Sequence, residues 1–357
     1  MVRIFKESGI LMEKSITMKD IAVKLGISTV TVSKALNDKD GVSIELKNKI
    51  KKLADEMGYR YNMLAKSMRD GCSYNIGVIV AEHFMGDQSF YLNFFKHISV
   101  HLEKHSYCGI LQILSQQDEE NLFLPKLYYE RKVDGLIILG QVSKPYIEAL
   151  QNIDIPIVFL DFYDENSKID SIAVDNFYGA YELTNYLIKN GHKNIGFIGN
   201  IYATSSIQDR FLGYYKSLLE HKFRLNDKHV ISDRDEHGRY IEIKLPQDMP
   251  SAYVCNCDEV ARNVINKLKE MGKAVPDDIS VVGFDNDMFS TISDPQLTTV
   301  EVDVEEMSKT AIKFILGKIS NESKKYGRIM VKGRIVYRQS VKNILSEGSK
   351  SHEILQP

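Results

Sequence analysis

Side chains able to bind DNA are concentrated on one short stretch near the N-terminus. Thr29, Thr31, Ser33 and Lys34 fall on the outer side of a helix expected over residues 29–36. Short hydroxyl side chains and a lysine can donate hydrogen bonds to phosphate oxygens and to base edges in the major groove. We therefore interpret this stretch as a DNA-contacting helix.

Two short helices joined by a tight turn would present those side chains. Thr17 is a favourable N-cap for a first helix over 18–25, Gly26 provides the turn, and Ser28 caps the second helix. A third helix is expected over 44–57. The apolar residues that two crossing helices would bury are Ile21, Ala22, Leu25, Ile27, Val32 and Leu36. This order predicts an all-α helix-turn-helix domain, whose second helix enters the major groove.

The charge of the chain is divided unevenly along its length. Residues 1–72 hold 14 Lys and Arg against 9 Asp and Glu, a net charge of +5, whereas the remainder carries −7. A basic head on an acidic body suits a protein that offers only its N-terminal part to phosphates.

Length and composition limit the class of protein. A chain of 357 residues with 43% hydrophobic residues indicates two or three globular domains. No run of about 18 apolar residues predicts a membrane span, and the charged N-terminus is not a secretory signal. The four cysteines follow no disulfide spacing, which favours the reducing cytoplasm: Cys72, Cys108, Cys255 and Cys257.

From Ile76 onwards, short apolar runs alternate with amphipathic helical segments. Continuous apolar strands of this kind predict parallel sheets covered by helices on both faces, and eight of them favour two doubly wound α/β lobes. The expected strands lie at 76–80, 109–114, 135–139, 156–160, 172–174, 195–199, 252–255 and 279–284. The segment 231–254 also reads as short and strand-like.

Two carboxylates directly follow predicted strands. Asp161 comes after 156–160 and Asp285 after 279–284. Ligands of open parallel sheets bind at the carboxyl ends of the strands, so both residues are candidates for ligand contact. The alternative is that each aspartate caps the helix after it.

The whole order of segments resembles the lactose-repressor (LacI/GalR) family over residues 17–340. Four segments carry the resemblance: 17–37, 59–80, 174–200 and 275–300. The resemblance implies a homodimer bound to a pseudo-palindromic operator, a hinge helix in the minor groove, and a periplasmic-binding-protein-like core that closes on a small sugar-like effector.

The resemblance also implies domain boundaries. They are an extension at 1–16, the helix-turn-helix domain at 17–61, the hinge at 62–73, the core at 74–340 and a tail at 341–357. Within the core, one lobe takes about 74–173 and part of 301–333, and the other takes about 174–298 and the remainder.

Family position assigns roles at the DNA end. Thr29, Val30 and Lys34 would face the bases, while phosphate and positioning contacts would come from Thr17, Ser28, Thr31, Ser33 and Asn37. Ser28 also serves as an N-cap, and Lys34 could be only a solvated lysine. In the hinge, Met68 replaces the usual wedging leucine and Tyr61 the usual proline. Met68 would unstack a base step or, alternatively, pack against its dimer mate.

Family position also assigns roles at the effector end. Asp161, Arg210 and Asp285 would hydrogen-bond ligand hydroxyls, Phe90 and Tyr91 would stack on an apolar ligand face, and Ser206 would add a hydrogen bond. The alternatives without a role in ligand binding are a salt bridge between the lobes for Arg210 and packing in the hydrophobic core for Phe90 and Tyr91. Cys257 replaces an asparagine of the family, a weak hydrogen-bonding group in place of a strong amide. The segment 231–254 stands where relatives usually carry a helix that borders the cleft, so the shape of the ligand should differ from that of the common sugars.

No cofactor or metal is expected. Cys255 and Cys257 have no nearby His or third Cys, so we interpret them as structural thiols. The preferred function is a transcription regulator, a repressor whose operator affinity a sugar-like effector controls. The alternatives are a stand-alone periplasmic-type sugar-binding protein, and an enzyme using Asp161 and Asp285 as acid and base. The sequence contains no nucleophile–base signature that would support an enzyme.

Overall fold

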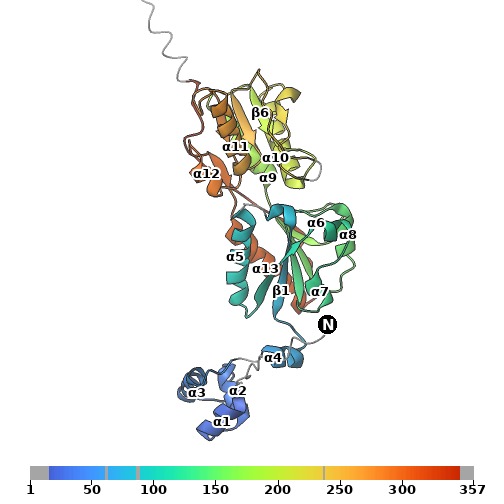
Figure 1. Cartoon of the computed structure of the whole chain (residues 1–357), viewed down its shortest axis with the longest axis vertical. Coiled ribbons are helices and arrows are strands. Elements are labelled where there is room, and N and C mark those ends of the chain that lie inside the picture. The colour runs from blue at the N-terminus through green and yellow to red at the C-terminus, as the bar shows by residue number, and fades with distance from the viewer. Residues whose placement is uncertain (1–15, 61–62, 86–88, 236–237, 346–357) are drawn as a thin grey trace, which may run out of the picture. The chain divides into compact units, whose positions relative to one another are not determined.

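A computed structural model describes residues 16–60, 63–85, 89–235 and 238–345 (Figure 1). The chain divides into two compact units, one ending at Cys72 and the other beginning at Ser73. Most of the predicted N-terminal extension and residues 346–357 of the predicted tail lie outside the described residues. No helix in the described ranges is both long and apolar enough to cross a membrane.

The first unit contains the helix-turn-helix that the sequence predicts. Helix α1 (Met18–Leu25) begins at Thr17, whose side chain and that of Asp20 form a capping box. Gly26 ends α1 in the left-handed region at φ +68°, and α2 (Thr29–Leu36) follows. Both predicted helices are confirmed.

A third helix, α3 (Ile44–Glu56), completes the small core of this unit. It ends one residue earlier than predicted, because Met57 is already the cap residue and Gly58 turns the chain at φ +69°. The fully buried side chains come from all three helices: Ile21, Ala22, Val32, Ala35, Ile50 and Ala54. The predicted hinge segment forms helix α4 (Met63–Asp70).

The second unit has two α/β lobes. Lobe 1 is built on a six-stranded parallel sheet in the order β11 (Arg328–Val331), β5 (Asp170–Val174), β4 (Ile157–Leu160), β3 (Gly135–Leu139), β1 (Asn75–Ala81) and β2 (Cys108–Leu114). Its helices are η1 (Glu82–Phe84), α5 (Ser89–Glu103), α6 (Gln116–Glu120), α7 (Lys126–Tyr129), α8 (Lys144–Leu150) and α13 (Val304–Ser320). Helices α5 and α13 pack against each other on one side of the sheet, and α6, α7 and α8 lie toward the other side (Figure 1).

Lobe 2 is built on a four-stranded parallel sheet. Its order is β7 (Val230–Ile231), β6 (Ile195–Ile198), β8 (Ala252–Cys255) and β9 (Ser280–Val282). Its helices are α9 (Asn176–Lys189), α10 (Ser205–Glu220), η2 (Asp227–His229), α11 (Asp258–Glu270) and α12 (Met288–Ile292). Helices α9 and α10 approach closely at Gly213, where a Cβ atom would lie only 2.0 Å from the carbonyl oxygen of Phe177.

The chain passes between the lobes three times. It leaves lobe 1 after β5, returns to α13, and leaves again after β11 to end on lobe 2, where the Ser340 carbonyl accepts from Val281 N. At this crossing, β10 (Thr299–Glu301) and β12 (Arg334–Val336) form an antiparallel pair. Because three connections join the lobes, they can change their relative angle without separating.

The predicted fold class is confirmed, since all eight predicted strands are present and both large sheets are parallel. The strand-like interpretation of 231–254 is wrong over most of its length. Among its described residues only Ile231 in β7, an isolated bridge between Arg234 and Tyr240, and β8 have strand pairing. The physical reason is Asp233, whose buried carboxylate accepts hydrogen bonds from Asn200 N and Asn256 Nδ2 and so directs the chain away from the sheet.

Candidate functional site

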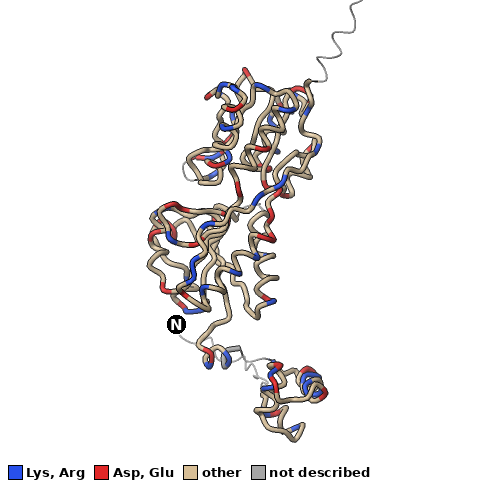
Figure 2. Tube along the Cα trace, turned by 180° about the vertical axis from the view of Figure 1, so that it is seen from behind, with Lys and Arg blue, Asp and Glu red and all other residues tan. Residues whose placement is uncertain are grey.

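The outer side of α2 is open to solvent. Thr29, Val30 and Lys34 are exposed, and Val30 keeps 63% of its surface accessible despite its apolar side chain. These are the residues expected to face DNA bases. Lysine and arginine residues are frequent on this unit (blue in Figure 2), as phosphate binding requires.

The residues expected to contact phosphates also organise the helix ends. Ser28 Oγ accepts a hydrogen bond from Thr31 N at 3.0 Å and shares a second bond with Thr31 Oγ1 at 2.8 Å. Asn37 Nδ2 donates to the carbonyl oxygen of Ser33 at 2.7 Å, and Thr17 caps α1. The N-cap role predicted for Ser28 is therefore confirmed, and the hydroxyls lie where helix N-termini meet solvent.

Met68 is an exposed apolar side chain of the hinge helix. It keeps 86% of its surface accessible on α4. An exposed, flexible apolar side chain on a helix suits insertion between base pairs or packing against a second copy of the helix.

A pocket between lobes 1 and 2 brings together all seven residues predicted for the effector site. They are Phe90, Tyr91, Asp161, Ser206, Arg210, Cys257 and Asp285. Asp161 is at the carboxyl end of β4 in lobe 1 and Asp285 follows β9 in lobe 2, so the strand ends of both sheets contribute, as open α/β folds favour.

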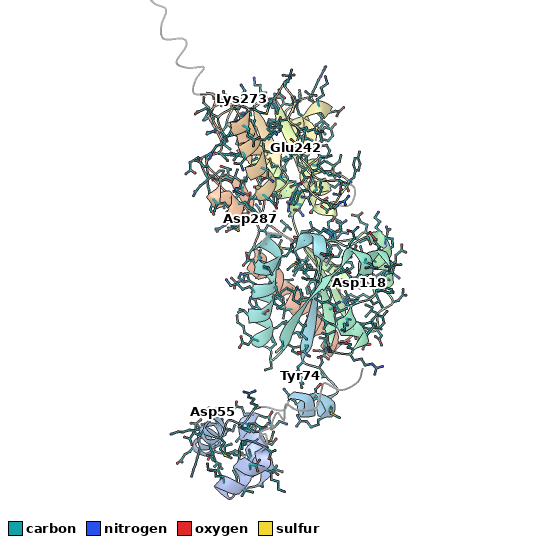
Figure 3. All side chains as sticks on the ribbon, in the orientation of Figure 1. Asp55, Tyr74, Asp118, Glu242, Lys273 and Asp287 are labelled. Carbon is teal, nitrogen blue, oxygen red and sulfur yellow. The ribbon has the colours of Figure 1, made fainter. Side chains whose placement is uncertain are left out.

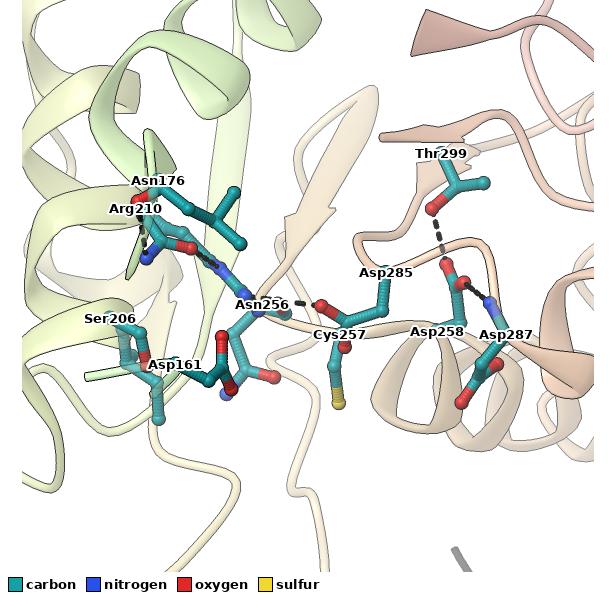
Figure 4. A network of polar contacts seen from close by, with 12 residues as sticks. Asp161, Asn176, Ser206, Arg210, Asn256, Cys257, Asp258, Asp285, Asp287 and Thr299 are labelled. Atoms are coloured by element: carbon teal, nitrogen blue, oxygen red, sulfur yellow. Dashed lines mark hydrogen bonds and ion pairs between the residues drawn. The ribbon is translucent and has the colours of Figure 1, made fainter. Parts of the chain in front are cut away.

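Arg210 is the most extensively held side chain of this pocket (Figure 4). Its Nε donates to Asn176 Oδ1 at 2.7 Å, and its Nη atoms donate to the carbonyl oxygen of Asn256 and, at 3.1 Å, to Asp285 Oδ1. The guanidinium also lies 3.8 Å from the centre of the Phe284 ring. These contacts fix a planar donor group in a buried site, where it can bind a ligand without further ordering.

Asp161 and Tyr91 form the lobe 1 side of the polar pocket. Tyr91 Oη donates to Asp161 Oδ2 at 3.1 Å. Burial raises the pKa of Asp161 to about 7; the charge of Arg210 opposes this shift, and that of Asp285 adds to it. Burial likewise raises the pKa of Asp285, against the effect of Arg210.

The backbone at both aspartates is unusual. Asp161 has φ +66° and Asp285 has φ +105°, a region that residues other than glycine rarely adopt. Strained backbone of this kind concentrates at ligand sites, because the surrounding fold must hold it.

Aromatic rings line one side of the pocket. The rings of Phe90 and Tyr91 meet edge to face with centroids 5.2 Å apart, and Phe84 lies 4.9 Å from Tyr91. Such rings can cover the apolar face of a ligand. On the opposite side, the Ser206 hydroxyl bonds to Thr204 Oγ1 at 2.9 Å.

Sequence reasoning missed other residues of the pocket, notably Arg234, Tyr240, Gln141 and Asp287. Arg234 pairs with Asp233 at 2.8 Å and lies over the Tyr240 ring, 4.7 Å from its centre. The sequence feature that could have pointed to Arg234 and Tyr240 is the charged and aromatic composition of the segment around residue 235. Asp287 lies at the end of lobe 2 that faces lobe 1 (Figure 3).

Cys257 is the N-cap residue of α11 but makes no capping hydrogen bond. Its Sγ lies 4.0 Å from Tyr240 Oη, and burial raises its thiol pKa. A buried neutral thiol is a weak hydrogen-bonding group. Among the described side chains, no group of three His, Cys, Asp or Glu is arranged to hold a metal ion.

Two comparisons with protein families match separate parts of the chain. Residues 17–62 match "Bacterial regulatory proteins, lacI family", and residues 184–341 match "Periplasmic binding protein-like domain". The helix-turn-helix and a large part of the core therefore have independent matches.

Similar proteins extend over almost the whole chain. The HTH-type transcriptional repressor PurR of Vibrio campbellii is 27% identical over 334 residues, covering 92% of this chain and 99% of PurR. Catabolite control protein A of Priestia megaterium is also 27% identical over 334 residues, covering 92% and 100%.

Solved structures have the same fold. A Lac repressor dimer bound to operator and an anti-inducer aligns with TM-score 0.71 at 21% identity, covering 92% of this chain and 100% of that one. A complex of the transcriptional regulator CelR with cellobiose aligns with TM-score 0.65 at 21% identity, covering 91% and 99%.

The fold and the two sites define a DNA-binding transcription regulator with an effector-binding core. The chain carries a helix-turn-helix domain that matches the LacI family of bacterial regulatory proteins, followed by a periplasmic-binding-protein-like domain. PurR of Vibrio campbellii and the Lac repressor are named as repressors.

Proposed function

We propose that this protein is a cytoplasmic transcriptional repressor, not an enzyme, whose affinity for a pseudo-palindromic operator changes when a hydroxylated, sugar-like effector binds between lobes 1 and 2. The observation that carries the proposal is the buried Arg210, held by Asp285 beside Asp161 in the interlobe pocket. Guanidinium and carboxylate groups bind hydroxyls through charge-assisted hydrogen bonds. The cellobiose complex of CelR supports a sugar as the effector class.

On the DNA side, the proposed contacts are those of the exposed face of α2. Thr29, Val30 and Lys34 read base edges, and the residues of the helix ends contact phosphates: Thr17, Ser28, Thr31, Ser33 and Asn37. Met68 of the hinge helix unstacks a central base step. The repressor names of relatives such as PurR support repression as the direction of control.

A homodimer is part of the proposal. Lobe 1 exposes apolar side chains on α5 and on its neighbouring edge strand β2, with Leu92 and Val100 each 49% accessible and Ile113 equally so. Apolar surface on adjoining elements is typical of a protein interface. The dimeric, operator-bound Lac repressor supports two copies acting on two half-sites.

The proposed mechanism is a population shift. The effector contacts residues of both lobes, so it binds one interlobe angle more tightly than others and favours that angle. Lobe 1 begins directly after the hinge segment, and its rearrangement alters how two hinge helices fit the operator. The coupling is reciprocal, so bound operator must change effector affinity by the same factor.

The test is selection of bound duplexes from a random DNA pool by the purified full chain at moderate salt. A recovered pseudo-palindrome supports the proposal, and release of that DNA by a sugar supports effector control. The proposal is contradicted if the selection recovers only sequence-independent, salt-sensitive binding, both with and without a sugar mixture. That outcome would favour a protein that binds sugars without regulating DNA.

A further inference from the structure

The charges that line the interlobe pocket do not balance. We propose that the effector carries a protonated amine in addition to hydroxyl groups, as an amino sugar does, and that the carboxylates of Asp161 and Asp287 provide the negative charge that balances it. This inference rests on the proposed function, because it concerns the ligand of the same pocket.

Both guanidinium groups of the pocket already have anionic partners. Arg210 pairs with Asp285 at 3.1 Å, and Arg234 pairs with Asp233 at 2.8 Å. Each arginine therefore has its charge neutralised within the protein. The charge of Arg210 also acts on Asp161, where it opposes the rise in pKa, but the ion-pair contact of Arg210 is with Asp285.

Among the described residues, Asp161 and Asp287 accept hydrogen bonds from neutral donors only. Asp161 accepts from the Tyr91 hydroxyl at 3.1 Å, and Asp287 accepts from the backbone N–H of Phe289 at 2.8 Å. Within the described ranges, neither carboxylate takes part in an ion pair with a Lys, Arg or His side chain. Burial lowers the pKa of His83, the histidine that lines the pocket, which favours its neutral form.

The cations beside the pocket are also occupied. Lys332 and Arg334 line the hollow that adjoins Asp285 and Asp287, but Lys332 pairs with Glu182 at 3.8 Å and Arg334 pairs with Glu301. Buried Asp161 and half-buried Asp287 are consequently left without a cation in contact among the described residues, and the Glu259 side chain adds a further carboxylate to the pocket lining. Burial raises the pKa of Asp287, like that of Asp161, to about 7, with the Asp285 charge adding to the shift.

The aromatic wall complements these carboxylates. Phe84, Phe90 and Tyr91 line the same pocket as Asp161 and Asp287, and the faces of aromatic rings attract cations. A protonated amine would gain from both kinds of group in a site with little water. With a neutral ligand, these carboxyl groups can lose their charge near pH 7 only by binding a proton, whereas a protonated amine supplies the compensating charge itself; an anionic ligand would be repelled.

The experiment compares amino sugars with their neutral parents. The melting temperature of the full chain is measured near pH 7 with glucosamine and glucose, galactosamine and galactose, and mannosamine and mannose. Calorimetry then gives both affinities for the pair with the largest effect. We expect the amine to bind at least about ten-fold more tightly than its parent.

Variants locate the amine. Asp161→Asn keeps an acceptor for Tyr91 but removes the charge, and we expect it to reduce the preference for the amine by about ten-fold with little change for the neutral parent. Asp287→Asn should act in the same direction. Glu148→Gln, an exposed carboxylate on α8, is the control and should leave the preference unchanged.

Equal or tighter binding of the neutral parents, or no stabilisation by any of the three amines, would overturn the inference. If a neutral sugar releases the selected operator, the regulator proposal stands while the amine inference fails. If no operator is recovered, the regulator proposal itself fails, whichever ligand binds.

Discussion

The Tyr163 hydroxyl donates a hydrogen bond of 2.7 Å to Asp209 Oδ2, and this contact joins the two lobes. Tyr163 follows β4 in lobe 1, whereas Asp209 is on α10 in lobe 2. Arg328 stacks on the tyrosine ring, 3.6 Å from its centre. A second connection runs from Ser205 N to Gln141 Oε1 at 2.8 Å. Together these contacts favour the interlobe angle seen in the structure.

Removal of the Tyr163 hydroxyl should favour other interlobe angles. We expect Tyr163→Phe to weaken effector binding by about two- to ten-fold, the effect of losing one hydrogen bond to a charged or neutral acceptor. Calorimetric titration measures the change. The control is Tyr202→Phe, at a side chain that is 87% exposed. Equal effector affinities for the two variants would show that the Tyr163–Asp209 contact does not influence the interlobe angle.

Loss of Arg210 should affect both stability and the effector response. Arg210→Ala leaves the buried Asp285 without its cation, so we expect the free energy of unfolding to fall by about 3–5 kcal/mol. DNA binding should persist but no longer respond to effector. Chemical denaturation and an operator release assay measure the two effects. The control is Lys216→Ala, an exposed change on the same helix, which should alter neither the stability nor the effector response. An Arg210→Ala protein that still responds to effector would exclude a role of Arg210 in effector binding.

Asp161 should make stability depend on pH. Its pKa is about 7 in the folded protein against an ordinary value of 3.8, so between these values the folded state binds more protons than the unfolded chain. The free energy of unfolding should therefore fall as pH rises from about 4 to about 7, by at most about 1.4 kcal/mol per pH unit for this group. Denaturant titrations at several pH values should give a shallower fall for Asp161→Asn. Parallel curves for the two proteins would contradict a raised pKa.

Lys34 should contribute to the choice of DNA sequence. We expect Lys34→Ala to lower affinity for the selected operator by about 1–3 kcal/mol and to relax the preferred base at one position of each half-site. Repeating the duplex selection with the variant measures both. The control is Lys52→Ala, at an exposed position on α3, which should weaken DNA binding without changing the preferred sequence. If Lys34→Ala behaves in the same way, Lys34 contacts phosphate rather than a base.

The elements that the sequence predicted are those with strong apolar patterns. β1, β3 and β8 are continuous buried runs, and they were found within one residue at each end. Strands β10, β11 and β12 were missed because they are short and contain charged residues, and β11 is a largely exposed edge strand. Their pairing depends on tertiary contacts, which local patterns do not contain.

The same distinction applies to the candidate site. Arg210, Asp161 and Asp285 were predicted because they occupy motif positions or follow strands. Arg234 and Gln141 belong to irregular segments, and only the folding of lobes 1 and 2 against each other brings them to the pocket. Which carboxylates of the pocket form ion pairs also depends on distances between atoms, and a sequence does not give these distances.

The position of β11 in the sheet has a consequence for synthesis on the ribosome. The edge strand of lobe 1 that pairs with β5 is formed by residues 328–331, and helix α13 beside it by residues 304–320. Lobe 1 therefore remains incomplete until residue 331 has been translated, although its first strand β1 emerges about 250 residues earlier. The helix-turn-helix needs only the first 60 residues or so, and can fold long before the part of the protein that controls it.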